Sequence, residues 1–232
     1  MKTIGLIGGM SWESSIEYYR IINETAKEKL GGLHSAKSLM VTVDFAEIEK
    51  LQHEARWEEA GQILVACAQD LERGGADFIV LCTNTMHKLA DQITAHVNIP
   101  FLHIADATAE KIVATGIKRI GLLGTRFTME HDFYKGRLIN NFGLDVIIPE
   151  KADREIVHQV IYEELVLGKI VDSSRIEYKR IMNDLLANGA EGIILGCTEI
   201  ELLIKEGDSL APLFPTTKIH AVAAVEKALE EA

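Results

Sequence analysis

The chain has 232 residues, of which 47% are hydrophobic, and a formal net charge of −11. This apolar content suffices for one large domain or two smaller ones and argues against disorder, whereas the acidic balance disfavours nucleic acid and anionic membranes as partners. No apolar run approaches the roughly 18 residues of a membrane span. Three widely spaced cysteines argue against a disulfide framework and favour a reduced, cytoplasmic location.

Short apolar segments alternate with longer helical patterns along the whole chain. The first, "TIGLIG", is short, is preceded by a single lysine and soon meets the polar "SWESS", so we expect a first strand rather than a signal peptide. Helical spacing of apolar residues predicts helices over 15–30 and 57–74. Apolar runs without strict alternation, separated by helices, indicate parallel strands buried on both faces. The predicted strands span residues 3–8, 38–45, 77–82, 100–105, 119–124, 144–149, 192–197 and 212–217.

Three segments of the first half recur, in the same order, in the second half. "IGLIGG" at 4–9 recurs as "IGLLGT" at 120–125, "GADFIVLCTNT" at 75–85 as "GAEGIILGCTE" at 189–199, and "NIPFL" at 98–102 as "LAPLF" at 210–214. Three collinear matches indicate a duplication and therefore two similar α/β lobes. We predict one lobe from residues 1–98 with 211–232 and another from 99–210. The helix after Phe101 and the final helix are expected to cross between the lobes.

The register of the repeat selects between neighbouring residues at one strand end. It matches Cys82 with Gly196 and Thr83 with Cys197. Successive side chains of a strand point to opposite faces, so Cys82 and Thr83 should not point the same way. Thr83 is therefore the equivalent of Cys197, and Cys82 is predicted to be a core residue. Cys67, on the apolar face of a predicted helix, receives the same interpretation.

Both positions of this pair suit ligand chemistry. Ligands of parallel α/β sheets bind outside the carboxyl ends of the strands, where Thr83 and Cys197 are expected to lie. Helices predicted over 86–97 and 200–207 begin just after them. Helix N-termini favour a bound carboxylate and favour a thiolate over a thiol, which predicts that Cys197 is a competent base near neutral pH.

At these residues the sequence resembles the aspartate/glutamate racemase family. The resemblance covers essentially the whole chain and rests on "GLIGGMSWESS" at 5–15, "TNT" at 83–85 and "GCTE" at 196–199. It implies two pseudosymmetric lobes with the active site in the interlobe cleft, a homodimer, and racemisation of amino acids without a cofactor. In this family a cysteine stands before Asn-Thr and another before Thr-Glu, so Cys197 matches the second and Thr83 replaces the first.

This replacement bears on the mechanism. A threonine hydroxyl is a much weaker acid than a thiol, so Thr83 can return a proton to a carbanion but is a poor base. Cys197 is thus predicted to be the strong base on one face of the α-carbon and Thr83 the donor on the other. Backbone N–H groups and polar side chains near both positions are expected to bind the substrate and stabilise the developing charge. The predicted substrate-binding residues here are Met10, Asn84, Thr85, Thr198 and Glu199.

The resemblance also implies how acidic substrates are selected. Family members typically place an arginine near the segment occupied here by "KLQHEARW", where Gln52 is the nearest match and Arg56 a weaker one. Lys169 fits the pattern of a second-lobe lysine that contacts the distal carboxylate. Gln52 in place of arginine should weaken the preference for aspartate and glutamate. Lys169 and Arg56 also have the simpler interpretation of solvated surface charges.

No cofactor or metal site is predicted. The glycines after the first strand match neither a dinucleotide fingerprint nor a P-loop, although they permit close approach of a ligand. His87 and His103 lack the acidic or cysteine neighbours that a metal needs.

Two other functional classes stay open. The presence of one cysteine in the pair is compatible with a decarboxylase or isomerase of small diacids, and with a non-catalytic protein that binds amino acids. Thr83, Asn84 and Thr198 also have the simpler interpretation of helix caps, which is compatible with ligand binding.

Overall fold

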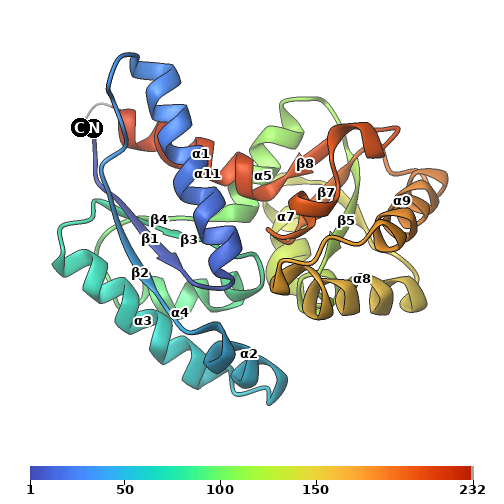
Figure 1. The fold of residues 1–232 in the computed structure, drawn as a ribbon, viewed down its shortest axis with the longest axis horizontal. Coiled ribbons are helices and arrows are strands. Elements are labelled where there is room, and N and C mark those ends of the chain that lie inside the picture. The colour runs from blue at the N-terminus through green and yellow to red at the C-terminus, as the bar shows by residue number, and fades with distance from the viewer. Residues whose placement is uncertain (231–232) are drawn as a thin grey trace. The chain divides into compact units, whose positions relative to one another are not determined.

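The computed structural model describes residues 1–230 and contains two parallel four-stranded sheets (Figure 1). The strand order is β2-β1-β3-β4 in the first sheet and β6-β5-β7-β8 in the second. All eight predicted strands are present, and the predicted α/β class is confirmed. Their bounds are β1 Ile4–Gly8, β2 Ser38–Thr42, β3 Phe78–Leu81, β4 Phe101–Leu102, β5 Arg119–Gly124, β6 Asp145–Ile147, β7 Ile193–Gly196 and β8 Leu213–Pro215.

Helices cover both faces of the first sheet. α1 (Trp12–Leu30) and α11 (Thr216–Leu229) pack on one face, and α2 (Phe45–His53), α3 (Trp57–Arg73) and α4 (Ala90–Thr94) lie on the other (Figure 1). β1 shows the reason: Ile4 and Leu6 point into the cluster with α1 and α11, and Ile7 points into the cluster with α2 and α3. The apolar run of β1 therefore serves two cores, as expected for a strand covered on both sides.

The second sheet has its own large core. It is flanked by α5 (Ile104–Val113), α6 (Arg126–Glu130), α7 (Asp132–Phe142), α8 (Lys151–Glu163) and α9 (Asp172–Ala187). α5 packs against α7, while α8 and α9 both pack against β5. One cluster of buried side chains joins these helices to the strands. The short segments η2 (Leu165–Leu167), α10 (Ile200–Leu203) and η3 (Glu206–Asp208) lie in the loops of this half.

The sheet registers reproduce the repeat seen in the sequence. In the first sheet Ile7 of β1 pairs with Leu81 of β3, and in the second sheet Leu123 of β5 pairs with Leu195 of β7. Ile7 and Leu123 are already equivalent in the sequence repeat, so Leu81 and Leu195 are equivalent as well. Two residues further along, Thr83 matches Cys197. The equivalence thus rests on hydrogen-bonded pairing as well as on letter similarity.

Two compact units are defined by contacts, Met1–His103 with His220 onward, and Ile104–Ile219. The boundaries expected from the sequence fall before the last strand of each half, whereas the units end after it. The reason is pairing: β4 hydrogen-bonds to β3 and β8 to β7, so each strand stays with the half that precedes it. α5 does lie in the second unit and most of α11 in the first, as the predicted crossings require.

The segments after the two strand ends are less helical than predicted. Residues Thr85–Leu89 form a 3₁₀ turn, η1, before α4, and α10 is a single turn of four residues. Such short elements add few aligned peptide dipoles. Of the helices in residues 1–230, none combines the length and the apolar character needed to cross a membrane.

Candidate functional site

Polar residues line the carboxyl end of the first sheet. After β3, Thr83, Asn84 and Thr85 are all at least nine-tenths buried, although they follow an apolar strand. The Thr83 carbonyl oxygen accepts a hydrogen bond of 2.7 Å from Nδ1 of His87. Burial of this many polar groups beside a sheet edge demands specific partners, which makes the segment a candidate site.

Gln52 and Met10 lie in the same region of the first unit. The Gln52 side chain is 3% exposed, and its Nε2 donates to Sδ of Met86, within η1. Met10 is equally buried and belongs to the same side-chain cluster as Met86. The structure therefore places Gln52 beside Met86 of the segment that follows Thr83, and Met10 in the apolar cluster to which Met86 belongs. Their contact with a substrate stays a prediction.

The glycine loop after β1 serves the protein's own backbone. Gly9 has φ of +91°, and a Cβ there would lie 2.3 Å from the Val43 carbonyl oxygen, so only glycine fits. Ser15 Oγ accepts a hydrogen bond from the Gly9 N–H and donates one to the Ser11 carbonyl, both at 2.8 Å. At Gly9 the close approach is to the backbone of Val43, just after β2, and the approach of a ligand to this loop stays a prediction.

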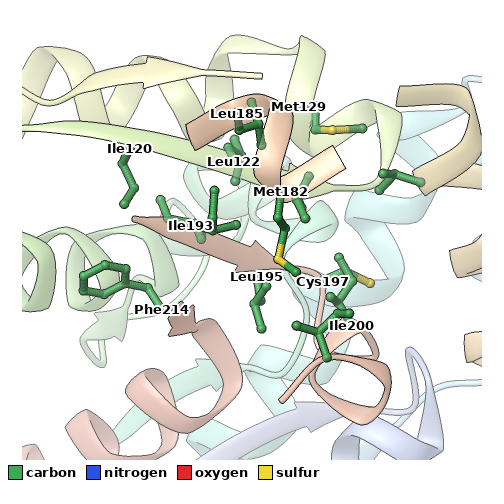
Figure 2. Close-up of a cluster of buried hydrophobic side chains, with 14 of the residues drawn as sticks. Ile120, Leu122, Met129, Met182, Leu185, Ile193, Leu195, Cys197, Ile200 and Phe214 are labelled. Atoms are coloured by element: carbon green, nitrogen blue, oxygen red, sulfur yellow. The ribbon is translucent and has the colours of Figure 1, made fainter. Parts of the chain in front are cut away.

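In the second unit, Cys197 follows β7 at the equivalent strand end. Its Sγ donates a hydrogen bond of 3.0 Å to Oε2 of Glu199, and Thr198 Oγ1 donates one of 2.7 Å to the same oxygen. All three residues are buried. Figure 2 shows the Cys197 side chain at the margin of the apolar cluster, close to Ile200 and Met182. Cys197, Thr198 and Glu199 thus form a compact polar group against a hydrophobic wall.

The protonation state of Cys197 corrects a prediction. Burial and then the negative charge and hydrogen bond of Glu199 raise the pKa of the Cys197 thiol well above its ordinary value. Hydrogen bonds from the backbone N–H groups of Glu199 and Ile200 lower this pKa, as predicted, but their effect is smaller than that of burial and Glu199. The following helix is one turn long, so its dipole is too small to offset desolvation. The raised pKa favours the thiol form of Cys197, whose Sγ lies 3.0 Å from Oε2 of Glu199.

The two predicted cationic residues are not part of either polar group. Arg56 is exposed and forms ion pairs with Glu54 and Glu59, which supports the surface interpretation. Lys169 is exposed in the loop after η2, which packs against α10. Within residues 1–230 its ammonium forms no ion pair, and its contact with a substrate stays a prediction.

The other cysteines are core residues, as predicted. Cys82 is fully buried among apolar side chains of β1, α1 and α11, and burial raises the pKa of its thiol. Cys67 is buried on α3. Neither forms a disulfide. The alternation along β3 is the cause: Leu81 points to the α2–α3 side and Cys82 to the α1–α11 side.

Sequence reasoning missed Glu201. Its Oε1 accepts a 2.7 Å hydrogen bond from the Thr217 N–H in the first turn of α11. Burial raises the pKa of the Glu201 carboxyl to about 7, although backbone and side-chain hydrogen bonds from Thr217 and the N–H of Lys218 oppose it. No local pattern signals this contact, because the two partners come from different helices, α10 and α11, and are 16 residues apart.

No metal centre is evident within residues 1–230, where no group of three or more His, Cys, Asp or Glu side chains is placed to hold an ion.

Comparison with known proteins identifies the family. The family model for Asp/Glu/hydantoin racemases matches residues 7–224. A candidate Asp/Glu racemase from Yersinia pestis is 56% identical, with a TM-score of 0.92 over 99% of this chain and 100% of that one. An aspartate racemase homologue from Pyrococcus horikoshii is 36% identical, with a TM-score of 0.85 over the same shares. The broad specificity amino-acid racemase RacX of Bacillus subtilis is 24% identical over 175 residues, 72% of each chain. The chain belongs to the Asp/Glu/hydantoin racemase family.

Proposed function

We propose that the chain is a cofactor-independent amino-acid racemase, with Cys197 and Thr83 acting on opposite faces of one α-carbon. The observation that carries the proposal is the register of the two sheets, which makes these residues equivalent strand-end positions. Family membership supports racemase activity in general. A reaction that removes a proton from one face and returns one to the other needs two such positions.

Glu199 has a specific part in the proposed mechanism. A buried thiol with a raised pKa is a poor base until it loses its proton, and Glu199 Oε2 is the acceptor at 3.0 Å. Transfer of the thiol proton to Glu199 leaves a thiolate, which then takes the α-proton of the substrate. Glu199 was predicted to bind substrate; its contact with Sγ favours the role of proton acceptor for Cys197.

Thr83 completes the inversion from the other face. Its hydroxyl donates a proton to the carbanion and is reprotonated by water, and Glu199 then returns its proton to the solvent, which restores the starting protonation states. The carbanion's charge spreads onto the substrate carboxylate, where N–H groups of Asn84, Thr85 and Thr198 stabilise it. Because a threonine hydroxyl is a weak acid and its alkoxide is hard to form, abstraction by Thr83 is slow.

The substrate class proposed is acidic amino acids or a broader set. Gln52 offers an amide where related enzymes typically carry a guanidinium, and an amide neutralises no carboxylate. Lys169 is the remaining candidate for the distal carboxylate. We expect Gln52→Arg to raise the preference for aspartate over asparagine, and Lys169→Met to lower it. Equal ratios of kcat/KM in wild type and both variants would contradict this assignment.

The decisive experiment follows α-deuterium incorporation from each pure enantiomer in deuterated water, without added cofactor. An equilibrium constant of one requires equal kcat/KM for racemisation in the two directions. The predicted asymmetry therefore appears as exchange with retention, fast for the enantiomer whose α-proton faces Cys197. A decarboxylase would instead release carbon dioxide, and a binding protein would do neither. Absence of exchange from every amino acid tried would refute the proposal.

Independence from cofactors is tested in the same assay. The acid, the base and the carboxylate ligands proposed above all belong to the chain. Exchange should therefore survive exhaustive dialysis against a chelator and treatment with hydroxylamine, which strips pyridoxal phosphate. Activity lost in this way and restored by a metal ion or pyridoxal phosphate would contradict the mechanism.

We further propose a cytoplasmic homodimer. The three cysteines are free, as a reducing compartment favours, and the family resemblance implies the dimer. Light scattering after size-exclusion chromatography measures the mass directly. A monomeric mass at micromolar concentration would contradict the proposed homodimer.

A further inference from the structure

His87 makes a contact that the proposed mechanism does not use. Its ring is 2% exposed, and Nδ1 lies 2.7 Å from the carbonyl oxygen of Thr83. A carbonyl oxygen only accepts hydrogen bonds, so Nδ1 carries the proton and donates it. The bond joins an imidazole to the peptide group between Thr83 and Asn84.

The 3₁₀ geometry of η1 explains why a side chain supplies this donor. In an α-helix the N–H of His87 would bond to the carbonyl four residues earlier, which is that of Thr83. Here it bonds to the Asn84 carbonyl instead, at 3.1 Å. The imidazole takes over the bond that the backbone N–H does not make.

The ring of His87 is held by aromatic neighbours in the same unit. His103 packs edge-on with ring centroids 4.5 Å apart, and Phe101 and His220 lie at 5.4 and 5.8 Å. His220 is itself fixed, because Nε2 donates to the Leu102 carbonyl and Nδ1 accepts from the Tyr18 hydroxyl. Burial lowers the pKa of His220 to about 4, so this neighbour is neutral. The packing leaves the His87 ring little freedom to turn away from Thr83.

A hydrogen bond to one side of a peptide group orients the other side. The peptide is planar and trans, so its C=O and N–H point in opposite directions. A donor that fixes the Thr83 carbonyl therefore fixes the direction of the Asn84 N–H. We propose that His87 is a positioning residue that aims the Asn84 N–H at the substrate carboxylate and keeps Thr83 in place. This inference rests on the proposed function.

The test compares substitutions that keep or lose a donor at the δ position. His87→Asn places an amide nitrogen at the same bond separation from the backbone as Nδ1, whereas His87→Leu has no donor. His87→Gln remains polar but places its nitrogen one bond further out, which serves if the leucine variant fails to fold. His96 is the matched control. Its Nδ1 lies 2.8 Å from the carbonyl oxygen of Gln92, also four residues earlier, but His96 is exposed just after the end of α4.

Deuterium exchange on aspartate and glutamate gives KM and kcat, and thermal unfolding reports the fold. We expect His87→Leu or His87→Gln to raise KM about tenfold or more, the loss expected when a charge-assisted bond is misaimed. The KM of His87→Asn should stay within about threefold of the wild-type KM, and the KM of His96→Leu should equal the wild-type value.

The outcomes separate the two proposals. If wild type exchanges an amino acid and His87→Leu and His87→Gln have unchanged KM, the positioning role is wrong and the racemase proposal stands. The positioning role is equally wrong if the KM of His87→Asn rises as much as that of His87→Leu while the asparagine variant keeps its fold. If wild type exchanges no amino acid, the proposed function fails and the positioning role fails with it.

Discussion

Glu201→Gln tests whether the half-buried carboxyl of Glu201, in α10, is protonated in the folded protein at neutral pH. The carboxyl accepts the Thr217 N–H, and burial raises its pKa from 4.5 to about 7. Below pH 4.5 it is protonated in both the folded and the unfolded chain. As pH rises from 4.5 to 7, the unfolded chain releases this proton and the folded chain retains it. The stabilisation is therefore present at low pH and is lost as pH rises through 7.

The size of the effect follows from the two pKa values. Integrated between pH 5 and pH 8, a change from 4.5 to 7 removes about 2.5 kcal/mol of unfolding free energy from wild type. Solvent and rearrangement at the carboxyl reduce the measured figure, so we expect roughly 1 to 2.5 kcal/mol. Glutamine cannot release a proton, so the variant lacks this part of the pH dependence.

Urea unfolding at pH 5, 6, 7 and 8 measures the effect, as the difference between wild type and Glu201→Gln at each pH. Far-ultraviolet circular dichroism is the suitable signal, because Trp12 and Trp57, the two tryptophans, both lie in the first unit and Glu201 in the second. Glu206→Gln, an exposed substitution in the same half, is the control. A variant that loses as much stability as wild type between pH 5 and 8 would refute the raised pKa.

The remaining predictions concern the two strand ends. Cys197→Ser should lower exchange at least about a hundredfold while retaining ligand binding by calorimetry, whereas Cys82→Ala should change stability but not exchange; equal losses of exchange would contradict the register. Glu199→Gln should slow exchange and yet speed alkylation of Cys197 at pH 7, because removal of the negative charge lowers the pKa of the thiol. Peptide mass spectrometry follows the alkylation, and a variant in which exchange and alkylation both slow down would show that Glu199 only supports the fold. Thr83→Cys should raise exchange of the slower enantiomer more than that of the faster one, and an unchanged ratio would mean that Thr83 does not face the α-carbon.

Much of the fold was legible in the amino-acid sequence because parallel strands buried on both faces leave an unmistakable apolar pattern. The internal repeat went further. From the sequence alone it made Thr83 the equivalent of Cys197. The strand pairing of Ile7 with Leu81 in one sheet and of Leu123 with Leu195 in the other agrees with this equivalence. It also assigned Cys82 to the core, because strand periodicity leaves no choice of face.

The boundaries of the two units and the short helices were harder to predict from the sequence. β4 and β8 stay with their sheets through inter-strand hydrogen bonds, which a repeat-based boundary does not detect. Sequence pattern also predicted helices after Thr83 and Cys197, but apolar spacing does not distinguish an α-helix from a 3₁₀ turn.

The amino-acid sequence by itself determined which residues stand at the two strand ends, because register and side-chain alternation are properties of the chain's own order. Only the tertiary structure decided their chemical state. The pKa of the Cys197 thiol depends on how much water packing removes and on the Glu199 carboxylate at 3.0 Å, and the orientation of the Thr83 carbonyl depends on an imidazole held by residues from β4 and α11. Glu199 and His87 are close in sequence to the residues that they contact, but the burial of Cys197 and the packing of the His87 ring against His220 arise from residues distant in the sequence, which no local pattern encodes.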